Sequence, residues 1–183
     1  MKKKKLYIGI VAQIGAGKDV AARYIETFYN AKALRSSDML GEILEILNLN
    51  SKKRRNLQLL PIAIRSAFGP KAISRAMTAR MKRQKANIVI WNGIRYPSDV
   101  AEFKKLPNAI LVGITAPERL RFRRITKREE KTGEGALTFK QFRIEEARDT
   151  EKNALMLIAG ADYKIENNRS LNRLHKELSK IME

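Results

Sequence analysis

Cysteine is absent from this chain of 183 residues, and histidine occurs only once, as His175. The lack of cysteine excludes disulfides, thiolate catalysis and cysteine-ligated zinc. A single histidine cannot form a histidine metal cluster, and it argues against a catalytic triad built around an imidazole base. Any chemistry of the chain therefore rests on carboxylates, lysine, arginine and the backbone.

Long apolar runs are also absent. No stretch of about eighteen apolar residues occurs, which argues against a membrane-spanning helix. The basic residues 1–5 precede an apolar run that Gly9 interrupts and that is too short for a secretory signal. We therefore expect a cytoplasmic protein, and its length predicts one domain with a substantial core.

Acidic residues are missing from a long internal stretch, residues 46–98. The chain has 38 Lys and Arg against 19 Asp and Glu, a net charge of +19, which implies anionic partners. Because solvated helices normally mix signs, this stretch either faces a polyanion such as nucleic acid or surrounds a phosphorylated small molecule. Its basic residues are Lys52, Lys53, Arg54, Arg55, Arg65, Lys71, Arg75, Arg80, Lys82, Arg83, Lys85 and Arg95.

The most informative stretch, residues 6–20, reads LYIGIVAQIGAGKDV. It predicts a buried strand, a glycine turn and the start of a helix. Glycines allow consecutive backbone N–H groups to point into one hollow, and a helix N-terminus adds further N–H groups and its dipole. Lys18 would place an ammonium on the same anion. The predicted phosphate loop comprises Gly15, Ala16, Gly17, Lys18, Asp19 and Val20.

This loop departs from the full Walker A pattern at two positions, because Ala12 replaces the first glycine and Asp19 replaces the final Ser or Thr. The hydroxyl at the final position normally ligates Mg²⁺. A carboxylate is also a hard oxygen ligand, so Asp19 is a candidate metal ligand. The alternative is that Asp19 only caps or complements the helix N-terminus.

Strands and helices alternate along the rest of the chain, which predicts an α/β fold with a parallel sheet covered on both faces. The residue pattern predicts further strands over 31–35, 87–91, 109–114 and 161–166, and helices over 18–29, 39–47, 97–106, 138–159 and from 171 onward. Capping boxes are expected at Thr115 with Glu118 and at Thr138 with Gln141. Two further helices are predicted over 51–85, which makes the connection between the second and third strands longer than a simple crossover. This stretch looks like an inserted substrate-binding lobe.

Two charged residues follow predicted strands at the edge where parallel sheets bind ligands. Asp38 follows the second strand, and it either faces a ligand or, like Ser36 and Ser37, caps the next helix. Arg95 follows the third strand in a turn with glycine and proline neighbours. Its guanidinium suits a bidentate phosphate contact, and the alternative is a surface cation.

Arginines also cluster before two glycines, at positions 133 and 135. Arg121, Arg124 and Arg128 are spaced three and four apart and are expected to share one helix face. We interpret this segment as an arginine lid over about residues 124–138, the alternative being a solvated helix face.

Several motifs, in this order, resemble the P-loop nucleotide kinases, and within them the dephospho-CoA-kinase-like and deoxynucleoside monophosphate kinase branch. The matching segments are 15–19 (GAGKD), 37–40 (SDML), 68–70 (FGP), 92–97 (NGIRYP), 116–118 (APE) with Arg121 and Arg124, 137–139 (LTF), and 161–168 (ADYKIENN). Together they span almost the whole chain.

The resemblance implies a three-layer P-loop NTPase fold with a five-stranded parallel sheet in the order two-three-one-four-five. It implies one domain over 1–183, with a core of about 1–50 and 86–183, a helical substrate-binding lobe over about 51–85 and a short lid over about 124–138. The implied activity is transfer of a phosphoryl group from ATP, with Mg²⁺, to a nucleoside or deoxynucleoside monophosphate, to dephospho-CoA or to a similar acceptor.

The resemblance also implies roles for individual residues. Residues 15–19 hold the ATP phosphates, and Asp38 lies beside the acceptor, where it orients or deprotonates a hydroxyl. Arg65 and Arg95 grip the acceptor's phosphate. The remaining implied contacts are lid contacts from Arg124 and Arg128 and adenine contacts from Asn167 and Asn168. One departure is Asn92, where members of this branch usually carry an aspartate that supports Mg²⁺. Either Asp19 supplies the missing charge or metal-assisted catalysis is weak in this chain.

A second hypothesis follows from the charge alone. A net charge of +19 exceeds what two phosphorylated ligands require, so the chain could instead be a nucleic-acid-associated P-loop ATPase or an RNA-binding module. The basic segments 52–55 and 81–85 would then contact phosphates. The sequence contains no aromatic RNA-binding motif.

Overall fold

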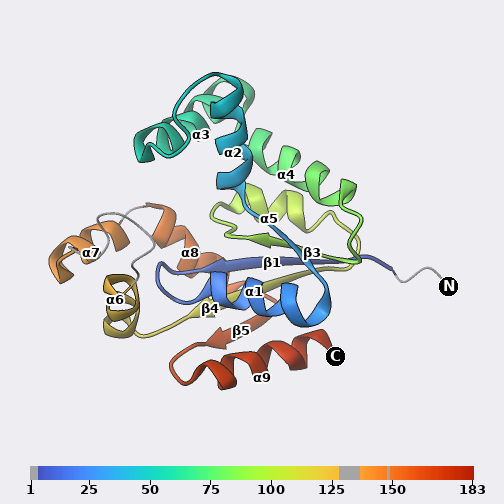
Figure 1. Ribbon diagram of the computed structural model, residues 1–183, viewed down its shortest axis with the longest axis vertical. Coiled ribbons are helices and arrows are strands. Elements are labelled where there is room, and N and C mark those ends of the chain that lie inside the picture. Colours follow the sequence, from blue (N-terminus) through green and yellow to red (C-terminus); the bar gives the residue numbers. More distant parts are fainter. Residues whose placement is uncertain (1–3, 128–136, 148) are drawn as a thin grey trace.

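A five-stranded parallel sheet lies at the centre of the computed structural model, which describes residues 4–127, 137–147 and 149–183. The strands are β1 (Leu6–Ala12), β2 (Lys32–Leu34), β3 (Ile88–Asn92), β4 (Ala109–Thr115) and β5 (Tyr163–Glu166). Their order is β2-β3-β1-β4-β5, as the resemblance implied, with Ile8 paired to both Ile90 and Ile110 (Figure 1). The predicted α/β fold with a parallel sheet is confirmed.

The central strand β1 is apolar throughout because helices cover both of its faces. Ile8 and Ile10 pack into a cluster with α1 (Lys18–Tyr29) and α9 (Leu171–Met182). Tyr7 and Val11 point the other way, into a cluster with α4 (Ala72–Arg83), the segment following α5 (Pro97–Phe103), and α8 (Asp149–Ala159). Gly9 faces this second side, where a Cβ would lie 2.7 Å from Ile94 Cδ1, so no larger residue fits.

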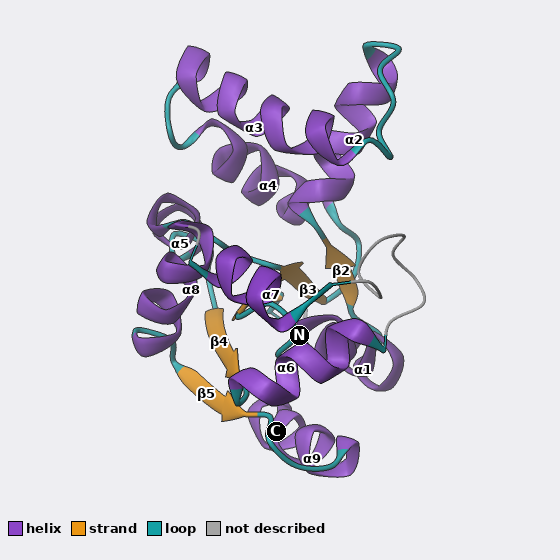
Figure 2. Ribbon diagram, turned by 90° about the vertical axis from the view of Figure 1, so that its left-hand side faces the viewer, coloured by secondary structure: helices purple, strands orange, loops and turns teal. Residues whose placement is uncertain are grey.

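A helical lobe stands beyond one end of the sheet (Figure 2). It consists of α2 (Ser36–Ile46), α3 (Arg54–Phe68) and the adjoining α4, and α3 contributes no fully buried residue. Trp91 at the end of β3 donates a hydrogen bond from Nε1 to Ser36 Oγ, 3.1 Å away. This contact ties the start of the lobe to the carboxyl end of the sheet.

Several predicted helix boundaries were wrong. Helix α2 begins at Ser36, with Arg35 as its N-cap and no side-chain cap, so none of the three polar residues predicted to cap it does so. Helix α6 (Glu118–Thr126) follows Pro117, and the Thr115 hydroxyl donates to Gln13 instead of forming a capping box.

The segment after residue 137 contains two helices instead of the single one predicted over 138–159. Helix α7 (Phe139–Glu146) begins with the predicted Thr138–Gln141 capping box, and Ala147 is its C-cap. Helix α8 then packs on β1 and β4, whereas α7 packs its Phe142 against Phe122 of α6. Helices α7 and α8 therefore pack against different parts of the molecule. Most of the predicted lid, residues 128–136, lies outside the described residues. Among the described helices, none is both long and apolar enough to cross a membrane.

Candidate functional site

The loop between β1 and α1 has the backbone geometry of an anion-binding loop. Gly15 and Gly17 have φ values of 76° and 107°, in the left-handed region that favours glycine. Gly17 is the N-cap of α1, and no described side chain caps this helix start. The N–H groups of the first turn are therefore available to an anion, whose charge the helix dipole also stabilises.

Both glycines are also required by close packing. A Cβ on Gly15 would lie 2.7 Å from the backbone oxygen of Arg121, and a Cβ on Gly17 would lie 2.5 Å from Asn167 Nδ2. Helix α6 and the segment after β5 thus press against the outer side of the loop. This packing fixes the loop conformation before any ligand binds.

Three side chains hold the loop's carbonyl groups. Asn167 donates from Nδ2 to the Ala16 oxygen at 2.8 Å, and Arg124 donates to the backbone oxygen of Asn167 at 3.0 Å. Arg121 donates to the oxygen of Ile14 at 3.3 Å. The predicted residues Arg124 and Asn167 therefore lie beside the phosphate loop, where they support its backbone.

The other predicted lid and adenine residues are placed differently. Arg121 and Arg124 both reach carbonyl groups of this loop, as their spacing predicted, but Arg121 is only 3% exposed and forms an ion pair with Glu146, so it supports the loop from a buried position. Asn168 is exposed and lines a shallow hollow beside the start of α9. Arg128 lies outside the described residues, and its role in the lid stays a prediction.

Lys18 and Asp19 form the charged centre of the site. Lys18 Nζ lies 2.8 Å from Asp19 Oδ1, and the same oxygen accepts a hydrogen bond from Asn92 Nδ2 at 2.9 Å. Arg35, at the end of β2, lies 3.3 Å from it. Asp19 is not the N-cap of α1, so the capping half of the alternative was wrong, but it lies in the first turn, where its charge complements the helix dipole as the other half expected. Through these contacts its carboxylate links the start of α1 to the carboxyl ends of β2 and β3.

These contacts shift both pKa values. Burial alone would raise the pKa of the Asp19 carboxyl, but the charge of Lys18, hydrogen bonds from Lys18 and Asn92, and the charge of Arg35 lower it to about 2. Burial lowers the pKa of the Lys18 ammonium, and its contact with Asp19 only partly opposes this. A half-buried cation beside the N–H groups of a helix start is well placed for an anionic ligand.

One buried acceptor beside this group has no partner among the described residues. Asn92 is 4% exposed, and while its Nδ2 binds Asp19, its Oδ1 accepts no hydrogen bond. Buried polar atoms are normally satisfied, so an unpaired one suggests that a ligand completes the site. A carboxylate and an amide oxygen are hard donors, which fit Mg²⁺ held jointly with phosphate oxygens.

Arg95 begins a second part of the site at the end of β3. Its turn is fixed by Asp99, which accepts hydrogen bonds from the N–H groups of Arg95 and Tyr96 at 3.2 and 3.1 Å. The Arg65 guanidinium from the lobe stacks 4.0 Å over the Tyr96 ring. The structure thus brings the two predicted acceptor arginines to adjacent residues.

Asp38 is exposed in the first turn of α2. Its side chain accepts a hydrogen bond from Ser37 at 3.3 Å. The pKa of Arg80 is raised mainly by the hydrogen bonds that Arg80 donates to Glu42, against the effect of burial, and the charges of Glu42 and Asp38 raise it further. Among the described contacts, none joins Asp38 to Lys18 or Arg95. Its predicted place beside the acceptor stays a prediction.

Two residues of the site were missed from the sequence. Arg35 could have been found by the rule that identified Arg95, because it also follows a parallel strand. Glu151 on α8 accepts a hydrogen bond from the Ile14 N–H at 2.9 Å and lies 3.6 Å from Arg95. Nothing in the sequence around Glu151 indicated this contact, because it depends on how α8 packs on the sheet.

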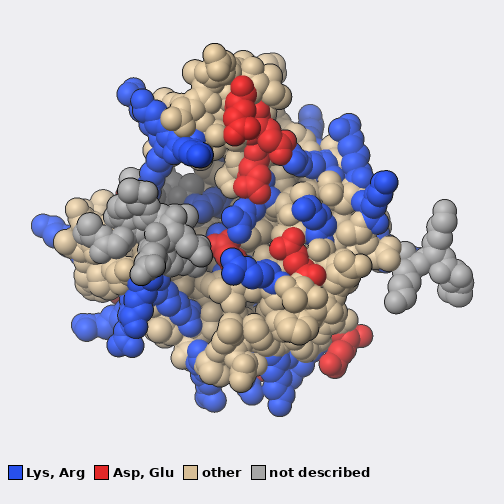
Figure 3. Space-filling model, viewed as in Figure 1, with Lys and Arg blue, Asp and Glu red and all other residues tan. Residues whose placement is uncertain are grey.

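The charges around this region are unevenly distributed. Figure 3 shows acidic side chains gathered over α2, with basic side chains around them and beside the hollow below the lobe. Arg80 binds Glu42 through two hydrogen bonds of 2.6 Å, so part of the lobe's positive charge is already neutralised. Lys18 and Arg35 share the carboxylate of Asp19, and Arg95 lies 3.6 Å from Glu151, so three cations of the site face two carboxylates and leave positive charge for a ligand.

The chain resembles archaeal proteins whose name states no activity. It is 24% identical to a UPF0200 protein of Sulfurisphaera tokodaii, covering 96% of this chain and 94% of that protein. It is 27% identical to a UPF0200 protein of Methanocaldococcus jannaschii, covering 97% and 89%. No family model matches the chain.

Solved structures of kinases share the fold. A shikimate kinase from Bacteroides thetaiotaomicron matches with a TM-score of 0.64 and 12% identity, covering 97% of this chain and 96% of that one. TT1252 from Thermus thermophilus matches with a TM-score of 0.62 and 21% identity, covering 98% and 97%. At such identities the likeness shows the fold, which is that of P-loop kinases.

Proposed function

We propose that this protein transfers a phosphoryl group from ATP to a nucleotide-like small molecule. One observation carries this proposal: a rigid glycine loop at a helix N-terminus is surrounded by Lys18, Arg35 and Arg95, which come from three different strand ends. Phosphoryl transfer needs mainly in-line positioning and cations around the spreading negative charge. The site supplies both.

The donor phosphates would lie on the N–H groups of the loop and the first turn of α1. Lys18 now pairs with Asp19, and phosphate oxygens would take over the ammonium as the nucleotide binds. Because the pKa of Lys18 is lowered by burial, its charge is incompletely compensated, and a polyanion would stabilise it. Arg124 and Asn167 would keep the loop closed around the phosphates.

Asp19 and the unpaired Asn92 Oδ1 would hold Mg²⁺ together with phosphate oxygens. The ion would neutralise the charge that develops on these oxygens during transfer. In this assignment Asp19 would supply the negative charge that Asn92 lacks at the position where the motif resemblance implies an aspartate. The low pKa of Asp19 keeps that carboxylate ionised at every pH at which a kinase works.

The acceptor would bind between the lobe and the sheet, held by Arg65 and Arg95. The Arg65 guanidinium stacks on Tyr96, the residue next to Arg95, and arginine binds phosphate through paired hydrogen bonds. The motif resemblance to dephospho-CoA-like and deoxynucleoside monophosphate kinases supports a nucleotide-like acceptor. The lobe of α2, α3 and α4, which extends the predicted range of about 51–85 by α2, is then the substrate lobe, and a lid carrying Arg128 would close the site.

The test is a coupled assay of ADP release with Mg²⁺, ATP and a panel of acceptors, namely the nucleoside and deoxynucleoside monophosphates and dephospho-CoA. We expect ADP release that depends on one class of acceptor and that falls at least 100-fold in Lys18→Ala. Lys180→Ala, on the exposed face of α9, is the matched control and should retain full activity. Background rates with every acceptor, from folded protein, would contradict the proposal.

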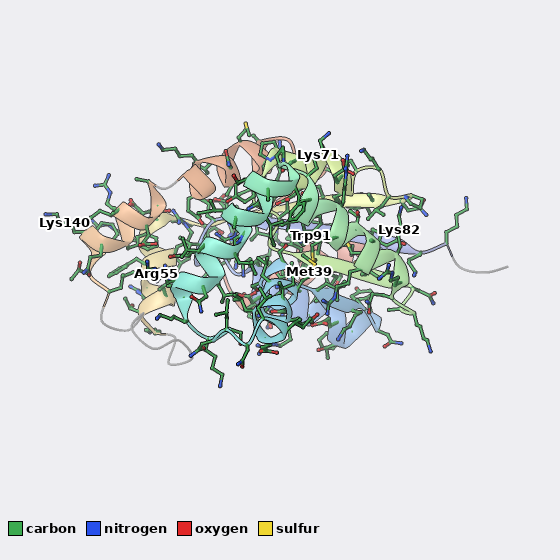
Figure 4. The ribbon with its side chains drawn as sticks, turned by 90° about the horizontal axis from the view of Figure 1, so that it is seen from above. Met39, Arg55, Lys71, Lys82, Trp91 and Lys140 are labelled. Atoms are coloured by element: carbon green, nitrogen blue, oxygen red, sulfur yellow. The ribbon has the colours of Figure 1, made fainter. Side chains whose placement is uncertain are left out.

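A second candidate function is nucleic-acid binding by the lobe. Residues 52–55 are four consecutive basic side chains, all exposed. Figure 4 shows Arg55, Lys71 and Lys82 spread over separate parts of the molecule instead of at one small-molecule site. Titration of labelled RNA at two salt concentrations tests this candidate: affinity should fall steeply with salt. No binding at low salt would eliminate it.

A further inference from the structure

Glu151 is a carboxylate that the phosphate-loop motif does not include. It lies on α8 and is only 8% exposed. One of its oxygens accepts a hydrogen bond from the Ile14 N–H at 2.9 Å, and the other lies 3.6 Å from Arg95. Glu151 therefore bridges the start of the phosphate loop and the arginine proposed to hold the acceptor.

These contacts place Glu151 on the acceptor side of the loop. Asn167 and Arg124 instead bind the carbonyl of Ala16, two residues further along the loop. Arg95 also lies near Lys18: burial lowers the pKa of Lys18, Asp19 opposes the shift, and the charge of Arg95 lowers the pKa further. The carboxylate is thus close to the place where the transferred phosphoryl group meets its acceptor.

The charge of Glu151 is less compensated than that of Asp19. Asp19 contacts Lys18 at 2.8 Å, Arg35 at 3.3 Å and the Asn92 amide at 2.9 Å. The described partners of Glu151 are one backbone N–H and Arg95, whose side chain is 50% exposed and lies beyond hydrogen-bond distance. Because Glu151 is buried and anchored, Arg95 is the partner that can move toward a substrate.

A fixed carboxylate at this place discriminates between two kinds of acceptor. It repels a phosphate dianion that approaches as the nucleophile, because like charges at close range in a partly buried site are unfavourable. It accepts a hydrogen bond from a hydroxyl group and can receive its proton. Arg95 beside it would bind an anionic group elsewhere on the same acceptor molecule.

We propose that the acceptor reacts through a hydroxyl group and that Glu151 receives the hydroxyl proton, an inference that rests on the proposed kinase function. The hydroxyl oxygen forms a bond to the γ-phosphorus of ATP while the bond from that phosphorus to the bridging oxygen breaks. ADP leaves with the electron pair of the broken bond. The proton passes to the Glu151 carboxylate and then to water, so the product is a phosphate monoester.

The first experiment identifies the bond that forms. Wild-type protein is incubated with Mg²⁺, ATP and either the nucleoside monophosphates or dephospho-CoA, and the products are examined by ³¹P NMR. In proton-decoupled spectra, transfer to a hydroxyl adds a new monoester singlet to the signals of the acceptor, ATP and ADP, whereas transfer to a phosphate replaces the acceptor's own monoester singlet with a signal split by coupling between two phosphorus atoms. We expect the singlet. A split signal would overturn the hydroxyl inference and leave the kinase function standing, and no product from any acceptor would overturn both.

The second experiment tests Glu151 with the acceptor that gives product. Glu151→Gln keeps an oxygen that can accept the Ile14 N–H but cannot take a proton. We expect kcat to fall at least 100-fold, with the acceptor KM changed less than threefold and nucleotide affinity unchanged. Glu151→Asp, which restores a carboxylate on a shorter side chain, should recover part of kcat. Glu177→Gln on α9 is the matched control and should behave as wild type.

Asp38 provides the competing assignment. If Glu151 receives the proton, Asp38→Asn loses less kcat than Glu151→Gln. A Glu151→Gln protein with unchanged kcat, or one whose whole defect is a raised acceptor KM, would overturn the assignment. Thermal unfolding of each variant confirms that the protein compared is folded.

Discussion

Replacing Asn92 with aspartate would test the charge balance at the centre of the site. Asn92 is buried, and its Nδ2 donates to Asp19 Oδ1 at 2.9 Å. Asn92→Asp would remove this donor and place two carboxylates in contact without changing the side-chain shape. The substitution also introduces the residue that the motif resemblance implies at this position.

The magnitude follows from two competing costs. Two unit charges about 3 Å apart repel by about 6 kcal/mol at an effective dielectric constant of 20. Protonating one carboxyl, with an ordinary pKa of 3.8, costs about 4 kcal/mol at pH 7 and preserves a hydrogen bond to Asp19. Protonating one carboxyl costs less free energy than holding two carboxylates in contact, so the protein would take up the proton. We therefore expect about 4 kcal/mol of destabilisation at pH 7.

The sign of the pH dependence is also fixed. The folded state raises the pKa of the new carboxyl above its unfolded value, so the destabilisation grows as pH rises above about 4. At pH 5 the cost of protonation is about 2 kcal/mol. The difference in unfolding free energy between Asn92→Asp and wild type should therefore fall by about half between pH 7 and pH 5.

The assay is urea unfolding at both pH values without Mg²⁺. Asn87→Asp makes the same chemical change at an exposed position just before β3 and should shift stability by less than about 0.5 kcal/mol. Mg²⁺ should stabilise Asn92→Asp more than wild type, because the second carboxylate adds a ligand. If Asn92→Asp were as stable as wild type at pH 7 without Mg²⁺, the charge reasoning would be refuted.

Three further predictions concern the loop and its support. Gly17→Ala puts a side chain on a residue in the left-handed region and against the Asn167 amide. It should therefore lower the unfolding free energy by about 2 kcal/mol, and calorimetry should detect no ATP binding. The control Gly41→Ala in α2 should be neutral or stabilising. Arg121→Met removes the ion pair of Glu146 with Arg121 and should lower the free energy of unfolding, measured in urea, by about 3 kcal/mol. An unchanged midpoint would contradict the supporting role of Arg121. Because the pKa of Asp19 is lowered to about 2, its ionisation adds about 2 kcal/mol above pH 4, and the stability gap between wild type and Asp19→Asn should shrink by that amount as pH falls from 4 to 2.

The sequence predicted the sheet and the phosphate loop because both depend on local patterns. The apolar run of β1 and the glycines at 15 and 17 are contiguous, and their meaning does not depend on distant contacts. The strand order came from the motif resemblance. The capping box at Thr138 was also local, and it is confirmed.

The errors arose where packing between segments that are distant in sequence determines the local structure. The periodic pattern over 138–159 continues through residue 147, but α7 packs against α6 whereas α8 packs on the sheet, and the chain turns between them. Helical spacing alone put Arg121 on a lid face. The structure buries it because Glu146 and the Ile14 carbonyl accept its hydrogen bonds from other elements.

The missed site residues have the same explanation. Arg35 reaches Asp19, and Glu151 reaches Ile14 across 137 positions of sequence. Local patterns do not record such contacts. The loop's backbone geometry was therefore predicted from the sequence, its phosphate-binding role stays a prediction, and the predicted site lacked the residues that β2 and α8 contribute.

The most direct test of the account is a titration of ¹⁵N-labelled protein with ATP and Mg²⁺, followed by amide NMR. If the glycine loop is the phosphate site, the resonances of residues 15–19 shift first and saturate together, and Lys18→Ala raises the midpoint at least tenfold. Shifts confined to the basic segments 52–55 and 81–85, equal in wild type and Lys18→Ala, would show that ATP meets only a basic surface and would contradict the account.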